Sequence, residues 1–153
     1  MQRNELLKQL QRDYHFEFNV GDRIVRLLFD RKWWISFESI EDEDIFFMYA
    51  TIAKIPVDQE VIVHKRALAG NLFGKETGEA TLALHEDKRL LVLFQRFYEA
   101  KTDYDAFKRA VENLIAYLDY WQEKLQSHLE DVSDLQDHFR GLQRADDLQI
   151  FFA

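Results

Sequence analysis

Five histidines are the residues of this sequence best suited to metal binding or acid–base catalysis, and their spacing favours neither. They are His15, His64, His85, His128 and His138. Protein zinc sites place their ligands at short, regular spacings such as HExxH, and none of these histidines follows one. His64, which falls in an expected helix, is the best single candidate among them. We therefore expect neither a metal site nor a cofactor.

Carboxylates are abundant, but they occur in runs such as Glu41–Asp44 and Asp146-Asp147. General acid–base catalysis needs carboxylates in a cleft that perturbs their pKa, whereas runs of acids in loops are ordinarily solvated. The sequence also lacks a P-loop, a GxGxxG motif and a GxSxG motif. The sequence predicts a protein that is not an enzyme, and a small hydrolase that uses these acidic residues is the competing interpretation.

Basic and aromatic residues lie together in one segment. Arg23, Arg26, Arg31 and Lys32 precede Trp33-Trp34. Such a mixture occurs in sites for single-stranded nucleic acid. The net charge of −8 argues against phosphate binding. Cross-strand pairs and a protein-binding edge explain the segment better, and we expect no nucleic-acid partner.

Length and composition fit one soluble domain in the cytoplasm. The chain has 153 residues, of which 47% are apolar, and it has no cysteine. The missing cysteines exclude a disulfide framework and agree with a reducing compartment. The N-terminus lacks the apolar core of a secretion signal, and no apolar run approaches the roughly 20 residues of a membrane span. We expect no membrane insertion.

The hydrophobic pattern predicts an α+β domain in the order αβββαββα. Helices are expected over 3–13, 59–73 and 103–129, and strands over 24–29, 33–38, 45–53, 80–85 and 89–98. These elements suit a twisted antiparallel sheet of about five strands with helices packed on it. The domain is expected over 1–130. Residues 131–153 are expected to form a C-terminal extension, with a short helix and an apolar end at Ile150–Phe152.

The last long helix has the clearest pattern. Its apolar positions recur every three or four residues at Phe107, Val111, Leu114, Leu118, Trp121 and Leu125. Thr102 with Asp105 resembles a capping box at its start. The stripe covers only about three heptads, so packing on the domain's own sheet is favoured over a coiled coil.

The strand over 89–98 has more apolar residues than a sheet covered on one side needs. Leu90–Phe94 is an unbroken apolar run, and alternate side chains of a strand point to opposite faces. A small domain should leave the second face polar. The sequence therefore predicts that another chain covers part of that face.

Several local patterns stand in a familiar order between residues 3 and 129. They are Leu6-Leu7 and Leu10, Ile55-Pro56, Leu68–Phe73, Thr77-Gly78 before Ala80–Leu84, Arg89–Leu93, and Tyr120-Trp121. Together with the element order, they resemble the class I chaperones of bacterial type III secretion, the Tir-chaperone-like family. The end of the second helix matches the LLxxN region of that family, with Ala67 at the first position as a departure.

The resemblance implies an ATP-independent cytosolic chaperone that acts as a homodimer. It would bind the N-terminal segment of a secreted effector in extended form and keep it competent for secretion. A regulatory adaptor of the same fold, which sequesters an anti-activator or another cytosolic protein, is the alternative. A fold relative outside secretion systems, which binds only itself or a small protein partner, is a further one.

Two sets of apolar residues are expected to make these contacts, although an ordinary core position competes for each residue. The client-binding set is Leu6, Leu7, Leu10, Ile24, Leu28, Trp33 and Ile35. The dimer-interface set is Ile62, Leu68, Leu72, Leu91 and Leu93.

Overall fold

The computed structural model describes residues 1–16 and 21–130, and their elements follow the predicted order αβββαββα. The helices are α1 (Arg3–Tyr14), α2 (Glu60–Asn71) and α3 (Tyr104–Lys124). The strands are β1 (Ile24–Phe29), β2 (Trp33–Ser39), β3 (Ile45–Lys54), β4 (Thr81–His85) and β5 (Leu90–Tyr98). The expected extension over 131–153, with its helix and apolar end, lies outside the described residues.

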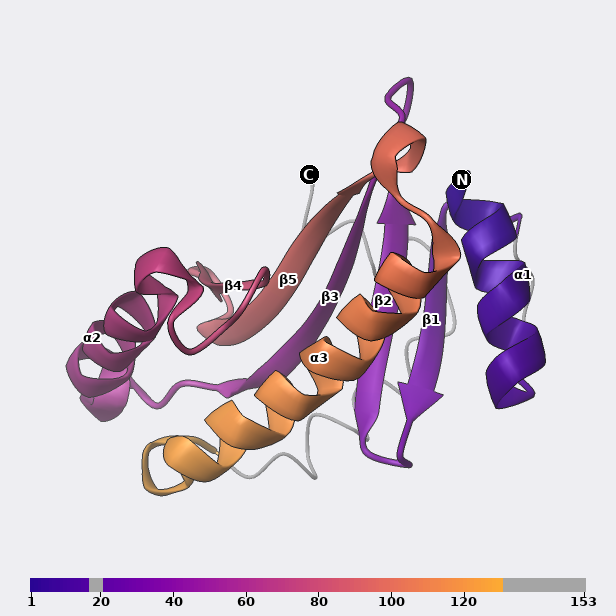
Figure 1. Cartoon of the computed structure of the whole chain (residues 1–153). Coiled ribbons are helices and arrows are strands. Elements are labelled where there is room, and N and C mark those ends of the chain that lie inside the picture. The colour runs from indigo at the N-terminus through magenta and orange to yellow at the C-terminus, as the bar shows by residue number, and fades with distance from the viewer. Residues whose placement is uncertain (17–20, 131–153) are drawn as a thin grey trace.

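The five strands form one antiparallel sheet in the order β1-β2-β3-β5-β4, which confirms the predicted fold class (Figure 1). Strands β3 and β5 are its longest members and pair from Ile45 opposite Tyr98 to Lys54 opposite Leu90. The register shifts between Thr51 and Ala53, where β3 has an irregularity. Strands β1 and β4 are therefore the two edges of the sheet.

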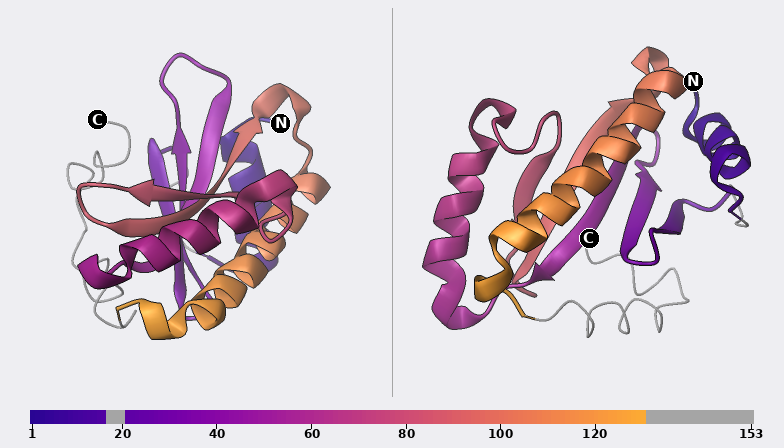
Figure 2. Two further views of the ribbon diagram at one scale, coloured as in Figure 1. Left: turned by 90° about the vertical axis from the view of Figure 1, so that its left-hand side faces the viewer. Right: turned by 60° about the horizontal axis from the view of Figure 1, so that its bottom comes forward.

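All three helices contribute to the core on one face of the sheet. Helix α3 crosses in front of the strands, α1 lies beside β1, and α2 lies at the β4 edge (Figures 1 and 2). Along β1, exposure alternates: Val25, Leu27 and Phe29 are buried, and the residues between them are only half-buried. Within residues 1–16 and 21–130, no helix covers the opposite face. We call that opposite side the second face.

Helix α3 contributes the predicted apolar stripe to this core, because Phe107, Val111, Leu114, Leu118 and Trp121 are all buried. The helix ends at Lys124, five residues before the predicted end, and a short 3₁₀ turn follows. The predicted capping box is wrong. Asp103 is the N-cap, and its side chain accepts a hydrogen bond from the Ala106 N–H. The Thr102 hydroxyl instead donates to the Tyr98 carbonyl.

Helix α1 is held to the sheet by a buried arginine at its start. The Arg3 guanidinium donates to the backbone carbonyls of Asp22, Arg23 and Phe37. Burial lowers the pKa of Arg3, and its three carbonyl partners compensate for the lost hydration. The other end of α1 is tied to α3, because the Tyr104 hydroxyl donates to Asp13. The helix is therefore fixed at both ends.

The long apolar run of β5 is divided between the two faces. Leu91 and Leu93 belong to the main core, whereas Leu90 and Val92 join Tyr49 in a separate cluster. Phe47 and Phe94 pack against that smaller cluster and are half-buried. The second face thus has an apolar cluster of its own over β3 and β5.

Candidate protein-binding surfaces

The structure does not bring the seven predicted client-binding residues onto one surface. Leu6, Leu7, Leu10, Trp33 and Ile35 are buried in the main core, at most 2% exposed. Ile24 and Leu28 alternate with the buried positions of β1 and are half-buried. The first five therefore support the sheet from within, and only the last two lie where another chain has access. Their contact with a client stays a prediction.

Trp34 is a neighbouring residue that the sequence analysis did not select. It lies opposite Leu28 in the β1–β2 register and is half-buried, whereas the adjacent Trp33 is in the core. Alternation of side chains along the strand was the signal that separates the two tryptophans. We call Ile24, Leu28 and Trp34 the outer strip.

A polar network lies between the outer strip and the cluster on β3 and β5. Glu38 is only 1% exposed, and its carboxylate accepts hydrogen bonds from Arg23 at 2.8 Å and from the Tyr49 hydroxyl at 3.0 Å. Arg26 donates to the Ser36 hydroxyl at 3.2 Å. Burial, with the nearby Glu38 charge, raises the pKa of Tyr49, and burial lowers the pKa of Arg26. The network satisfies a buried carboxylate in the middle of the sheet.

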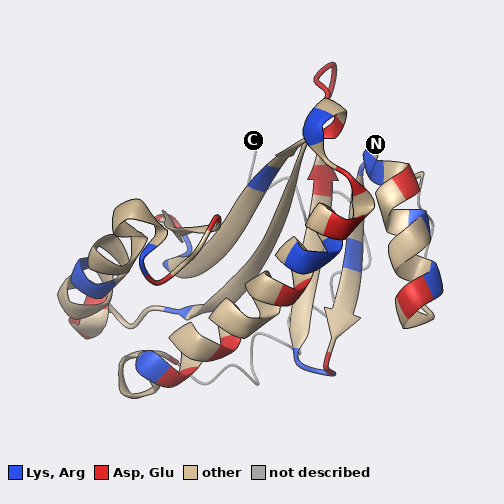
Figure 3. Ribbon diagram, in the orientation of Figure 1, with Lys and Arg blue, Asp and Glu red and all other residues tan. Residues whose placement is uncertain are grey.

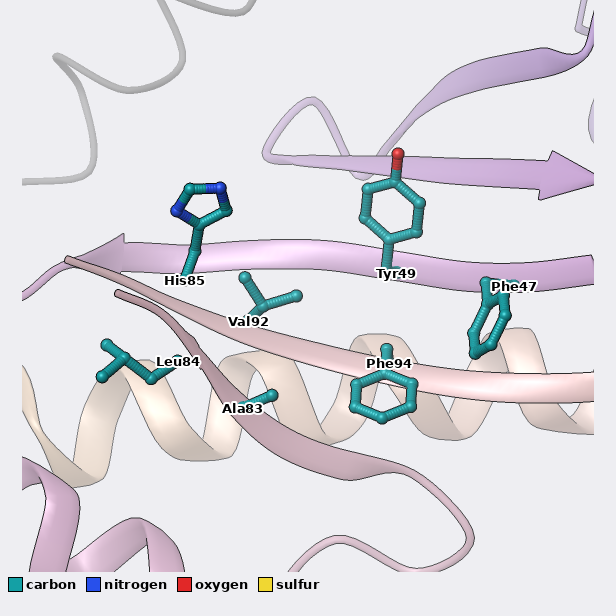
Figure 4. A pocket seen from close by; sticks show the side chains of 7 residues that line it. All are labelled: Phe47, Tyr49, Ala83, Leu84, His85, Val92 and Phe94. Carbon is teal, nitrogen blue, oxygen red and sulfur yellow. The ribbon is translucent and has the colours of Figure 1, made fainter. Parts of the chain in front are cut away.

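Next to this network, the side chains of three strands enclose a hollow of about 230 Å³, which we call the β4–β5 pocket (Figure 4). It is lined by Phe47, Tyr49, Ala83, Leu84, His85, Val92 and Phe94. In Figure 4 these residues come from β3, β4 and β5, and the Tyr49 and His85 side chains point to the same side of the sheet. The guanidinium of Arg96 lies 5.8 Å from the Phe47 ring centre. The pocket is thus apolar, with a cation at one end.

Helix α2 and the short turns at its two ends present the most exposed apolar side chains of the described chain. Of the predicted dimer-interface residues, Ile62, Leu68 and Leu72 are exposed, and Leu68 reaches 72%. Leu91 and Leu93 are buried within the domain's own core. Dimer contact by any of the five stays a prediction.

Sequence analysis missed three further members of this surface. Val57, Val61 and Phe73 are 64%, 80% and 99% exposed. The spacing of the apolar residues could have predicted this surface. Val57, Val61, Leu68 and Leu72 recur at intervals of four, seven and four residues, which is the spacing of one helical face. Of this helix, only Val63, Ala67 and Gly70 are buried within the domain. We call the exposed set, Val57, Val61, Ile62, Leu68, Leu72 and Phe73, the α2 row.

Specific contacts fix the orientation of α2. The Asn71 side chain forms two hydrogen bonds of 2.8 Å with the backbone of Leu82. It donates to the Leu82 carbonyl and accepts from the Leu82 N–H. Gly70 lies against the Trp121 ring, and the Trp121 indole N–H donates to the Glu76 carbonyl at 2.8 Å. The α2 row is therefore presented by a helix anchored to both β4 and α3.

The described residues give no sign of a metal centre or a membrane span. Within residues 1–16 and 21–130, no three His, Cys, Asp or Glu residues converge as metal ligands. No helix in that part of the chain has the length and apolarity needed to cross a bilayer.

Comparison with known proteins gives a family and a set of similar folds. Residues 5–122 match the Tir chaperone protein (CesT) family. Comparison with curated proteins gives no match.

Three solved structures illustrate the likeness of the fold. A chain of the ExsC-ExsE complex has a TM-score of 0.63 at 17% identity, covering 78% of this chain and 90% of its own. A chain of the HopA1-SchA chaperone-effector complex has a TM-score of 0.62 at 19% identity, with 78% and 95% covered. A chain of the ExoU-SpcU complex from the type III secretion system of Pseudomonas aeruginosa has a TM-score of 0.61 at 19% identity, with 77% and 93% covered.

The family match spans most of the chain, from the middle of the first turn of α1 to near the end of α3, and the similar structures share its sheet and helices. The chain therefore belongs to the Tir chaperone protein family.

Proposed function

We propose that this protein is an ATP-independent cytoplasmic chaperone that binds the N-terminal segment of a secreted effector in extended form. The observation that carries this proposal is the second face of the sheet. It bears half-buried apolar and aromatic side chains on β1, β2, β3 and β5, and no helix of residues 1–16 and 21–130 covers it. Apolar surface of this kind on a folded domain commonly marks a protein interface.

The client is assigned to the outer strip, where Ile24, Leu28 and Trp34 project from β1 and β2. Burying one large apolar side chain contributes about 1.5–3 kcal/mol. Burial of a few such side chains therefore offsets the conformational entropy that the client loses when it becomes ordered. The strip includes residues of the edge strand β1, so an extended client can also add its backbone to the sheet. We propose that the buried residues of the predicted set, such as Leu7 and Ile35, shape this strip from behind.

The α2 row is assigned to a homodimer. Its exposed side chains lie along α2 and the turns at its two ends, and the domain itself covers this helix only at Val63, Ala67 and Gly70. A dimer through α2 and the neighbouring β4 would bury the row without using the outer strip, which lies at the opposite edge of the sheet (Figure 1). Two subunits would then offer two client surfaces.

The dimer is tested with Leu68→Asp, because a carboxylate in the middle of the α2 row would oppose its own copy across a two-fold interface. We expect the wild-type protein to have the mass of a dimer by size-exclusion chromatography with light scattering, and Leu68→Asp that of a monomer. Ala116→Asp, on the exposed side of α3, is the matched control and should stay dimeric. A Leu68→Asp protein that keeps the dimer mass would remove α2 from the interface.

The client is tested by native mass spectrometry of the protein purified from its own host. A secreted protein bound to the dimer supports the chaperone. A transcriptional regulator or another cytosolic protein in its place would show the regulatory adaptor instead. Release of a bound effector only on addition of ATP would overturn the proposed mechanism.

A further inference from the structure

The β4–β5 pocket lies on the second face but away from the outer strip, near the opposite edge of the sheet. Its volume of about 230 Å³ is below the roughly 300–1,000 Å³ of pockets that hold drug-sized ligands. Its walls are mainly aromatic and aliphatic, from Phe47 and Phe94 at one end to Leu84 at the other. A hollow of this size and lining suits one or two large apolar side chains of a polypeptide.

We propose that the occupant is the C-terminal end of this same chain, the segment Leu148–Phe152. This segment is one of the most apolar stretches outside the described residues, with Leu148, Ile150, Phe151 and Phe152 among five residues. Three of these four follow directly on one another, so adjacent side chains are available for a pocket of limited depth.

The described chain ends beside the pocket. The Glu130 N–H donates to the Lys54 carbonyl at 3.1 Å, at the end of β3. Lys54 lies opposite Leu90, and Leu90 lies opposite His85, which lines the pocket. Two interstrand spacings separate Lys54 from His85, about 10 Å. The remaining chain therefore starts within reach of one end of the pocket.

The length that follows Glu130 is sufficient to reach the pocket, whether the segment is extended or helical. Phe47 lines the far end of the pocket. It lies seven residues from Lys54 along β3, a distance of about 23 Å. The 23 residues from Asp131 to Ala153 span about 75 Å when extended and about 35 Å as a helix. An intramolecular contact also has the advantage of a high effective concentration.

Charge favours the same occupant. Asp146 and Asp147 directly precede the apolar end, and Arg96 lies over the Phe47 ring at one end of the pocket. Figure 3 shows few charged residues along β3 and β5, whereas α3 and the loops carry many. An acidic pair followed by apolar residues therefore matches a pocket that is apolar inside and cationic at one end.

Docking is tested by a disulfide, which is unambiguous because the chain has no cysteine. The full chain with Ala83→Cys and Ala153→Cys keeps all four apolar residues of the end and places one thiol in the pocket. A disulfide needs Cα atoms about 4.4–6.8 Å apart. We expect an intrachain disulfide in a glutathione redox buffer, seen as a faster monomer band on a non-reducing gel and as a linked peptide by mass spectrometry.

The matched control pairs Ala153→Cys with Ala116→Cys, on the exposed side of α3 and on the other face of the sheet. It should oxidise at least tenfold less. Equal oxidation of the two pairs, or oxidation of neither, would overturn the proposal. A disulfide that forms only between two chains would also overturn it, because the occupant would then be a second copy.

A second measurement avoids cysteines. Phe151→Asp should vacate the pocket and raise the fluorescence of the dye ANS, which binds exposed apolar surface. Gln149→Asp adds the same charge without removing an apolar side chain, and should leave the fluorescence near that of the wild type. Equal fluorescence of the three proteins would contradict docking.

The docked end would lie near the β4 edge of the second face, away from the outer strip, so it should leave the client surface open. This consequence rests on the proposed function. The oxidised Ala83→Cys, Ala153→Cys protein should then capture as much of the effector found by native mass spectrometry as the reduced protein. If neither form captures an effector, the proposed function fails, whereas the disulfide result still decides where the end docks.

Discussion

At the scale of single residues, the junction of α2 with α3 depends on a glycine. A Cβ atom at Gly70 would lie 2.3 Å from the Trp121 ring, and Trp121 is fully buried. Gly70→Ala should therefore lower the free energy of unfolding by about 1–3 kcal/mol, as overpacked cores do, although alanine has the higher helix propensity by about 1 kcal/mol. Urea denaturation measures the difference.

Ala69→Gly is the control for that substitution, because Ala69 is exposed on the same turn. It should cost only the propensity difference, about 0.5–1 kcal/mol. If Gly70→Ala were instead more stable than the wild type, the indole would have to move without losing its hydrogen bond to Glu76. The glycine would then have no steric role.

The sequence predicted which residues form the apolar sets, but not which of their side chains are exposed. Leu6, Leu7 and Leu10 form the stripe that the sequence predicts, yet a stripe that faces a client and one that faces the core have the same spacing. Which of the two holds depends on α3, which lies about a hundred residues away in the sequence. Leu68 and Leu91 differ in the same way: both are apolar, and only the packing of the sheet buries one of them.

At the scale of elements, strand and helix types followed from the sequence, whereas their ends did not. The α3 stripe repeats over 21 residues, so its existence was well determined. Its end was overestimated because polar residues after Leu125 are equally compatible with a helix or a turn. Its cap was misplaced by one residue, since Thr102 and Asp103 are both good N-caps and only the Tyr98 carbonyl decides between them.

The contact between the turn that follows α2 and helix α3 predicts a pH dependence. The Glu76 carboxylate accepts hydrogen bonds from Lys124 and the Tyr120 hydroxyl, and these partners lower its pKa from the ordinary 4.5. A carboxyl with a lowered pKa stabilises the fold above its unfolded pKa, and that contribution disappears as the pH falls through the folded pKa. The wild type should therefore lose stability on acidification below about pH 4.5.

Glu76→Gln removes this titration, so its urea midpoint should fall less between about pH 5 and pH 3. Lys124→Met removes the main partner and should also flatten the dependence. Asp13, whose pKa is lowered by Tyr104 and Lys108, contributes with the same sign in all three proteins and leaves a residual slope. Identical slopes in the three proteins would show that Glu76 does not stabilise the junction.

At the scale of the whole molecule, the sheet separates the two proposed binding surfaces. The α2 row lies at the β4 edge, and the outer strip lies on the second face near the β1 edge (Figures 1 and 2). The sequence predicted the need for partners, because the apolar run Leu90–Phe94 exceeds what one covered face requires. It could not show which surface binds which partner, because each surface is formed by strands and helices that are distant in sequence.

Two substitutions of leucine by glutamate decide whether the client binds the second face. Leu28→Glu changes a half-buried residue of the outer strip, so the protein should fold and lose the effector. Leu7→Glu buries a carboxylate in the core, which costs several kcal/mol and should unfold the domain. Circular dichroism measures folding, and affinity capture of the co-expressed effector measures binding. Ala116→Glu, which is exposed on α3, should keep both fold and effector. A folded Leu28→Glu protein that captures as much effector as the wild type would move the client off the outer strip.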